Sequence, residues 1–267
     1  MRPTAAVRPP AAVLDAFGVN GPAVRLPGGQ RTAWRAGGLV LKPLDMPREA
    51  VQWLDQVARA RAAGSALRLS LPVEDTHGRL VVDGWTAFPY WEGTHATNRW
   101  SEIADVARAF SSAFDGVDRP HFISARTDPW ARADRFAWSE EVLSGAAAVP
   151  GVPDLVRARK PVAERSGIMH GDLAGNVLFD PVEPPAVIDL SLYWRPAEYA
   201  VAIVAADAAS FHGADPSAVR SADPGFPQYL LRALLFRMVT EWLNGKPLGD
   251  FAGYRDPVRQ ALVLAGR

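Results

Sequence analysis

The chain has 267 residues, of which 48% are hydrophobic and 22% are charged, and its formal net charge is zero. These values are ordinary for a globular protein with a sizeable core, and the neutral charge argues against a nucleic-acid or membrane-surface role. Because the chain contains no cysteine, a disulfide framework and a thiolate metal site are excluded. No apolar run is long enough to span a bilayer and no signal-like segment opens the chain, so we expect a cytoplasmic protein.

The first part of the chain predicts a glycine-turn hairpin. Residues 1–12 are rich in proline and are expected to form a loose arm. Strand-like residues from Val24 then lead into Gly28 and Gly29, and a second glycine turn precedes a strand that ends at Lys42. A glycine loop between antiparallel strands can lay its backbone N–H groups over phosphates, although most such turns bind nothing. Gly28 and Gly29 are therefore candidate nucleotide-binding residues.

Lys42 is the next candidate. The chain contains only three lysines, so its basic positions are nearly always arginine. A lysine at the end of the apolar run Leu39–Leu41 suggests selection for a compact ammonium group, which can contact phosphate oxygens as a point charge. The alternative is a strand-end lysine whose charged tip reaches solvent.

Further strands and then helices follow. Runs at 69–73 and 80–87 predict strands that complete a small antiparallel sheet, and an aromatic segment with Phe88, Tyr90 and Trp91 comes next. The remainder is mainly helical. Asp128 followed by proline predicts the start of a helix that carries Asp134; this helix either lines a pocket or simply packs on the domain.

The most informative stretch is Gly167–Leu190, where two short apolar strands flank a polar loop and a third delivers an acid. It places His170, Asp172, Asn176 and Asp189 at strand ends, where a rigid scaffold can hold loop residues. Phosphoryl transfer from a nucleotide would use this set. One carboxylate can accept the proton of an attacking hydroxyl, and an amide oxygen with a second carboxylate can hold magnesium.

The order His170-Gly171-Asp172, then Asn176, then Ile188-Asp189 resembles the catalytic and metal-binding segment of the aminoglycoside phosphotransferase and choline kinase family, in particular its actinobacterial-type members. The resemblance implies an α+β, bilobal, protein-kinase-like fold. Residues 1–92 would form a nucleotide-binding N-lobe with a small antiparallel sheet and one helix. Residues 93–267 would form a mainly helical C-lobe with the catalytic loop, the metal site and the acceptor pocket.

The same resemblance implies roles for individual residues. Asp172 and His170 would be catalytic, and Asn176 and Asp189 would bind the metal. In the nucleotide site, Lys42 would contact the phosphates, Glu49 would pair with Lys42, and the aromatic segment would form the hinge between the lobes beside adenine. The nucleotide-binding residues would be Lys42, Glu49, Gly28, Gly29, Phe88, Tyr90 and Trp91. The acceptor pocket would be lined by Trp194, Arg195, Asp134 and Glu241. Glu49 opens a helical pattern whose apolar face would carry Val51, Leu54, Val57 and Ala58. It could instead be a first-turn acid favoured by the helix dipole.

The loop departs from the kinase pattern at one point. Only three residues, Leu173, Ala174 and Gly175, separate Asp172 from Asn176, where kinases have four, and Gly175 would let the backbone take a tighter path. Three alternatives stay open: a plain turn with an Asx-type hydrogen bond, a nucleotide-binding regulator without transfer activity, and a protein kinase. The last lacks support because no A-P-E motif follows.

The predicted function is that of a small-molecule kinase. It would transfer the γ-phosphoryl group of ATP, or of GTP, to a hydroxyl of a small acceptor, with Mg²⁺ as the second cofactor. The expected partners are the nucleotide and the acceptor, without nucleic acid or membrane, and the expected state is a monomer or weak dimer. The sequence does not identify the acceptor, because a fold-level analogy does not determine a substrate.

Overall fold

The computed structural model describes residues 7–27, 32–95, 98–163, 165–215 and 218–266. The chain forms two compact units: unit 1 contains Met1–Thr94 together with Leu178–Asp189, and unit 2 contains His95–Val177 and Leu190–Arg267. These units differ from the predicted lobes mainly in the segment Leu178–Asp189, which was expected with the C-lobe. Among the described residues, no helix is both long and apolar enough to cross a membrane.

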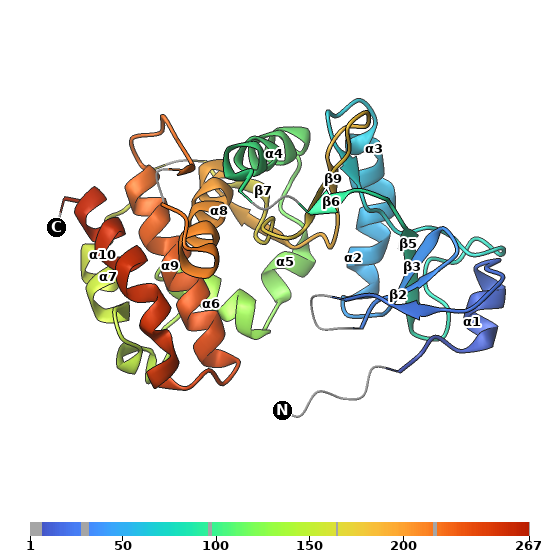
Figure 1. Cartoon of the computed structure of the whole chain (residues 1–267), viewed down its shortest axis with the longest axis horizontal. Coiled ribbons are helices and arrows are strands. Elements are labelled where there is room, and N and C mark those ends of the chain that lie inside the picture. The colour runs from blue at the N-terminus through green and yellow to red at the C-terminus, as the bar shows by residue number, and fades with distance from the viewer. Residues whose placement is uncertain (1–6, 28–31, 96–97, 164, 216–217, 267) are drawn as a thin grey trace. The chain divides into compact units, whose positions relative to one another are not determined.

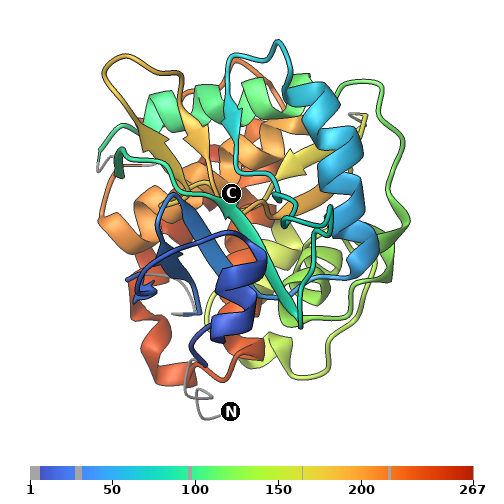
Figure 2. The same cartoon turned by 90° about the vertical axis from the view of Figure 1, so that its right-hand side faces the viewer.

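Unit 1 contains a four-stranded antiparallel sheet. Its strands run in the order β1 (Val24–Arg25), β2 (Trp34–Ala36), β3 (Leu39–Pro43) and β5 (Trp85–Pro89). Figure 2 shows β3 (blue) and β5 (teal) side by side, and α1 (Ala11–Ala16, dark blue) crosses them. α1 and the sheet share one core, because Val13 and Phe17 are buried in the same cluster as Leu41, Trp85 and Ala87. This core holds β3, and with it Lys42, in a defined register.

A second sheet in unit 1 corrects one expectation. Its order is β4 (Arg68–Leu69), β9 (Ala186–Val187), β8 (Val177–Phe179) and β6 (Thr94–His95). The strand expected at 69–73 was assigned to the antiparallel sheet. Val73 at its end does make an isolated antiparallel bridge to Ala87 of β5, but β4 at its start pairs in parallel with β9. The reason is that a two-residue strand has no local signal for its partner, and the distant segment 178–189 supplies one.

The helix predicted from Glu49 is present as one continuous helical segment. It consists of α2 (Arg48–Trp53), a π-helical turn η1 (Leu54–Ala58) and α3 (Arg59–Ala62). Its apolar face buries Val51, Leu54 and Ala58, which confirms the helical spacing of these positions.

Unit 2 is mainly helical. Two long helices, α8 (Ala197–His212) and α9 (Phe226–Leu243), pack against each other, with α4 (Trp100–Ala113) on α8 and α6 (Pro129–Ala137) on α9 (Figure 1). The shorter helical elements are α5 (His121–Ala125), η2 (Ala146–Ala148), α7 (Val152–Ala158), η4 (Leu248–Tyr254) and α10 (Arg255–Leu264). As predicted, Asp128 caps α6 by accepting a hydrogen bond from the backbone of Ala131, at 3.0 Å.

The helices α8 and α9 are buried on nearly all sides, and this explains their sequences. Both are apolar all round, as expected of helices in the centre of a large core. Three charged side chains interrupt these apolar stretches, and all three are buried: Asp207 on α8, and Arg232 and Arg237 on α9. A buried charge is costly unless it is paired, so each of these groups needs partners.

A two-stranded antiparallel ladder of β7 (Gly167–His170) and β10 (Leu192–Arg195) completes unit 2. β7 contacts both α4 and α8. Because Ile168 and Met169 on β7 are almost completely buried, the strand is rigidly held where it delivers the polar loop that begins at His170.

Candidate functional site

The polar loop of unit 2 is held by the ladder that precedes it. The Gly171 backbone N–H donates to the Ser191 carbonyl oxygen at 2.8 Å, which continues the pairing of β7 with β10. A Cβ atom on Gly171 would lie only 2.4 Å from a ring carbon of Tyr193. Glycine is therefore required here by the close approach of Tyr193, and the pair fixes the entry into the loop.

His170 is completely buried and contacts the backbone of the loop. Its Nδ1 lies 3.1 Å from the backbone N–H of Asp172, its Nε2 lies 3.1 Å from that of Ser191, and its ring packs edge-on against Phe110. Because a neutral imidazole has a single acceptor nitrogen, it takes one of these two bonds and carries its proton on the other nitrogen. His170 has no exposed surface and contacts the backbone at both ends of the loop, and its expected catalytic role stays a prediction.

The shortened loop closes through Gly175, as predicted. Gly175 has a φ of 84°, and the Asn176 backbone N–H donates to the Leu173 carbonyl oxygen at 2.9 Å, which makes a tight turn with glycine at its third position. The turn brings the Asn176 amide back to Asp172, where Nδ2 donates to the backbone oxygen at 2.7 Å and to Oδ2 at 3.2 Å. Three intervening residues are thus enough to bring the asparagine beside the aspartate.

The carboxylate of Asp172 is half exposed, and a buried arginine holds it. Arg237 Nη2 donates to Asp172 Oδ1 at 2.9 Å; the Asp172 side chain is 49% exposed, and that of Arg237 is 9% exposed. The same guanidinium donates to both oxygens of Asp207, from Nε at 2.6 Å and from Nη2 at 2.6 Å. Arg237 therefore links Asp207 in the buried core to Asp172 at the surface of the loop, through one hydrogen-bonded series of ion pairs.

The surroundings of Arg237 favour its ionised form. Burial alone would lower the pKa of Arg237, but the carboxylates of Asp207 and Asp172 outweigh burial, so the pKa lies above its usual range. Burial raises the pKa of Asp207, against the opposing attraction of Arg237. Arg237 thus remains a fixed positive charge beside Asp172.

In unit 1, two predicted site residues with different expected roles, Lys42 and Asp189, form an ion pair that was not predicted. Lys42 Nζ donates to Asp189 Oδ1 at 2.6 Å, and the Asp189 side chain is 56% exposed. Asp189 has a φ of 53°, a conformation that non-glycine residues adopt rarely and that is concentrated at functional sites. Asp45 lies in the field of the same pair: desolvation raises its pKa, Lys42 lowers it and Asp189 raises it, with a net increase.

The other predicted nucleotide-binding residues of unit 1 have different surroundings. Glu49 is exposed in the first turn of α2, and Phe88 is buried with Lys42 Nζ 5.9 Å from its ring centroid. The rings of Tyr90 and Trp91 lie under the guanidinium groups of Arg35 and Arg68, at 3.7 Å and 5.3 Å. Gly28 and Gly29 lie outside the described residues. The pairing expected between Glu49 and Lys42 stays a prediction.

The predicted acceptor residues fall into two places. Asp134 and Arg195 are both buried and form an ion pair with nitrogen–oxygen distances of 3.0 Å and 2.7 Å, and Arg195 also binds Glu140. Together with Trp194 they line a small hollow of about 30 Å³, which has room for little more than a water molecule. Glu241 is not part of it and is instead paired with Lys246 at 2.6 Å.

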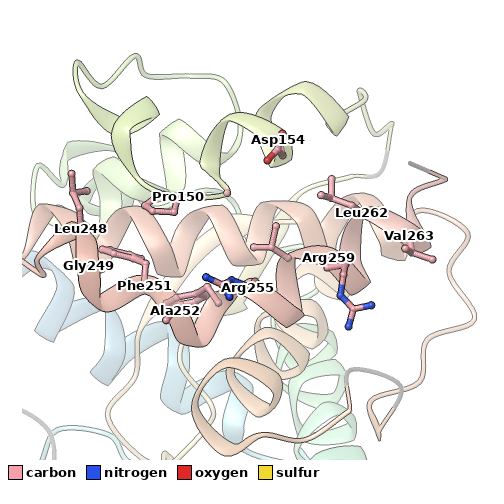
Figure 3. Close-up of a pocket in the computed structure, with 13 residues that line it drawn as sticks. Pro150, Asp154, Leu248, Gly249, Phe251, Ala252, Arg255, Arg259, Leu262 and Val263 are labelled. Carbon is pink, nitrogen blue, oxygen red and sulfur yellow. The ribbon is translucent and has the colours of Figure 1, made fainter.

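A larger hollow of about 580 Å³ lies elsewhere in unit 2 (Figure 3). It is formed where α7, η4 and α10 meet, and its lining is mostly apolar with three charged residues; it includes Pro150, Asp154, Leu248, Phe251, Arg255, Arg259 and Leu262. None of the predicted site residues that the structure describes lines this hollow.

Sequence reasoning missed Arg237 and Asp207, although a signal was present. Both are charged residues inside long apolar helical stretches, Asp207 in Ala200–Ala209 and Arg237 in Leu230–Val239. A charge in such a run is either a functional group or one half of a buried pair. The sequence does not show which charge pairs with which, because the partner of Arg237 is 65 residues away at Asp172 and 30 residues away at Asp207.

Comparison with known proteins supports the fold. No family model matches the chain, and no curated protein matches it either. Solved structures do match over nearly the whole length. An aminoglycoside phosphotransferase from Alicyclobacillus acidocaldarius is 13% identical with a TM-score of 0.60, covering 98% of this chain and 96% of its own.

Two further structures agree with it. A microcompartment-associated aminopropanol kinase is 18% identical with a TM-score of 0.59, covering 96% of this chain and 93% of its own. A spectinomycin phosphotransferase, solved with ADP and spectinomycin, is 12% identical with a TM-score of 0.56, covering 96% and 95%. At these identities the likeness concerns the fold, and it confirms the predicted fold class: the chain has the protein-kinase-like α+β fold of the aminoglycoside phosphotransferase and aminopropanol kinase structures.

Proposed function

We propose that this protein is a small-molecule kinase, which transfers the γ-phosphoryl group of ATP, or of GTP, to a hydroxyl group of a small acceptor. The observation that carries the proposal is the state of Asp172. It is a half-exposed carboxylate at the end of a rigid loop, with one oxygen held by Arg237, in a chain with the fold of known phosphotransferases. A carboxylate that is both oriented and accessible is what the proton acceptor in this reaction requires.

In the proposed reaction, the acceptor hydroxyl donates its proton to Asp172 as its oxygen attacks the γ-phosphorus. The bond from that phosphorus to the β–γ bridging oxygen breaks, and the nucleoside diphosphate leaves. Catalysis in this class comes mainly from positioning and electrostatic stabilisation, so the protein's task is to hold Asp172 still. His170 contributes by fixing the backbone of the loop, through its contacts with Asp172 and Ser191.

The nucleotide would be bound by the charged pair of unit 1. We propose that Lys42 contacts its phosphates, with Glu49 as a positioning acid, Phe88, Tyr90 and Trp91 beside the base, and Gly28 and Gly29 over the phosphates. Magnesium would be held by Asp189 and Asn176. A carboxylate and an amide oxygen are the hard oxygen ligands that suit this ion, which typically takes few protein ligands and completes its shell with water and phosphate. When bound, it would neutralise phosphate charge.

The acceptor remains the open part of the proposal. Trp194 is a candidate contact for it, whereas Arg195 and Asp134 are buried in their ion pair, and Glu241 lies with Lys246. We also propose that the protein works in the cytoplasm as a monomer or weak dimer, without nucleic acid or membrane partners.

A transfer assay tests the proposal. The protein is incubated with magnesium and ATP labelled on its γ-phosphate, alone and with pools of aminoglycosides and other antibiotics, amino alcohols, sugars and nucleosides, and the same pools are repeated with GTP. A thermal-shift screen with an ATP analogue and magnesium selects the pools. We expect label to appear in one class of acceptor, and slow release of labelled phosphate without acceptor. Nucleotide binding with neither transfer nor hydrolysis would instead indicate a nucleotide-binding regulator.

A further inference from the structure

Arg237 has a bonding pattern that fixes its orientation completely. It extends from the buried helix α9 and donates to Asp207 through two nitrogens, Nε and Nη2, both at 2.6 Å. A planar guanidinium gripped at two points by one carboxylate cannot rotate about its long axis. The second hydrogen of Nη2 therefore points in one direction only, and in that direction lies Asp172 Oδ1 at 2.9 Å.

We propose that Arg237 is a positioning residue for the Asp172 carboxylate, and that Asp207 acts through it. The inference deepens the proposed function and rests on it. Asp207 sets the plane of the guanidinium, and the guanidinium sets the orientation of Asp172. The acceptor's proton would then go to Oδ2, which accepts one bond from Asn176 at 3.2 Å and keeps a second lone pair. Asn176 also donates a side-chain hydrogen bond to Asp172, but its amide is neutral, so Arg237 supplies the positive charge.

A purely structural role would not require this third bond. Asp207 already supplies the carboxylate that a buried arginine needs, and Asp172 is exposed enough to be solvated by water. Arg232, on the same helix, shows a simpler arrangement: it is buried too, and it donates to the backbone carbonyl oxygens of Gln228 and Lys160 at 2.9 Å and 2.7 Å. Arg232 is therefore a matched control, a buried arginine of α9 that does not contact the loop.

The test compares variants of these residues in the transfer assay, or in MgATP hydrolysis if no acceptor has been found. Arg237→Met should lower kcat by about 10²-fold, because a misplacement of about 1 Å at a reacting group costs that much. The KM for ATP should change less than threefold. Asp207→Asn should lower kcat by about tenfold, because it weakens the two hydrogen bonds that hold the Arg237 guanidinium in place. Arg237→Lys should recover part of the loss, because an ammonium can reach a carboxylate but cannot bind both partners as a fork.

The control separates positioning from stability. Arg232→Met should lower the Tm as Arg237→Met does, yet leave kcat within threefold of the wild-type value when both are assayed well below their Tm. Equal kcat losses in the two methionine variants would overturn the inference, and so would unchanged kcat in Arg237→Met and Asp207→Asn. If the wild type itself neither transfers nor hydrolyses, the proposed function fails first, and the inference fails with it.

Crystal structures test the same point through geometry, without an activity measurement. In the wild-type protein with magnesium and a non-hydrolysable ATP analogue, we expect Arg237 Nη2 to remain within hydrogen-bond distance of Asp172 Oδ1. In Asp207→Asn the Asp172 side chain should occupy more than one rotamer. An Asp172 side chain turned away from Arg237 in the wild-type complex would overturn the inference, even if the kinase activity is found.

Discussion

Two buried arginines of unit 2, Arg195 and Arg237, have nearly the same surroundings but bind their half-exposed carboxylate partners differently. Each lies against one buried aspartate, Asp134 or Asp207, and against one half-exposed carboxylate. For Arg195 the outer group is Glu140, 45% exposed in its side chain, and for Arg237 it is Asp172, 49% exposed. Burial and composition alone would not tell these two clusters apart.

The number of hydrogen bonds that the arginine donates to the outer carboxylate distinguishes them. Glu140 accepts two, from Nη1 at 2.6 Å and from Nη2 at 2.8 Å, so both of its oxygens are engaged. Partial burial works against it, but the bonds from Arg195 keep the pKa of Glu140 below its usual range. Asp172 accepts one bond from its arginine, and its other oxygen accepts from the neutral amide of Asn176 at 3.2 Å. The same kind of buried arginine–aspartate pair thus binds the outer carboxylate through both oxygens in one place and through a single oxygen in the other.

The largest difference should appear when the outer carboxylates are neutralised. We expect Asp172→Asn to lower kcat by about 10²–10⁴-fold, the usual contribution of a general base, with little change in nucleotide affinity. Glu140→Gln is the matched control and should keep kcat within about threefold, because its carboxylate is already engaged. Steady-state kinetics and nucleotide titration measure both. Comparable losses of kcat would remove the distinction between the two clusters.

Removing Arg195, which binds Asp134 and both oxygens of Glu140, should affect stability more than activity. Arg195→Met leaves the buried Asp134 without its partner, which costs about 3–5 kcal/mol in the free energy of unfolding. Arg132→Met is a control on α6: Arg132 binds Glu141 at 2.8 Å with its side chain 42% exposed, and its loss should cost at most about 1 kcal/mol. Urea denaturation of both variants checks the ranking. A cost for Arg195→Met as small as that for Arg132→Met would contradict it.

A smaller effect is expected where the loop meets the ladder. Gly171→Ala forces Tyr193 to move, because the new Cβ would lie 2.4 Å from its ring. We expect a loss of about 1–3 kcal/mol in stability, typical of overpacking. Since Tyr193 also contacts Phe236, the residue before Arg237, the variant should lower kcat as well. Gly167→Ala, at the start of β7 and with open space at its Cβ, is the control and should change neither quantity appreciably.

The smallest effect concerns an arginine pair of unit 1 in which the arginine is exposed. The side-chain bonds from Arg79, with backbone bonds from Arg79 and His77, lower the pKa of Asp75 from 3.8 to about 2. Because the pKa of Asp75 is lower in the folded state, its carboxylate stabilises the fold at pH values above the unfolded-state pKa of 3.8. This contribution is lost as the pH falls from 3.8 towards 2. The stability difference between wild type and Asp75→Asn should therefore shrink over that interval, as measured by denaturation at pH 5, 4 and 3. A constant difference would contradict the assignment.

Much of the fold was predictable because its signals are local. The strand ending at Lys42, the helix from Glu49, the cap at Asp128 and the tight turn at Gly175 follow from spacing and residue type within a few positions. The parallel pairing of β4 with β9 was not predictable, since two residues carry too little pattern to select a partner more than a hundred positions away.

For the site, the sequence by itself determined which polar groups stand at strand ends: His170, Asp172, Asn176 and Asp189. Only the tertiary structure decided what holds them. It buried His170 completely, paired Lys42 with Asp189, and brought Arg237 and Asp207 from two helices to the Asp172 carboxylate. The physical reason is that backbone geometry is set by neighbouring residues, whereas a buried charge is neutralised by whichever opposite charge the packing of distant helices places beside it.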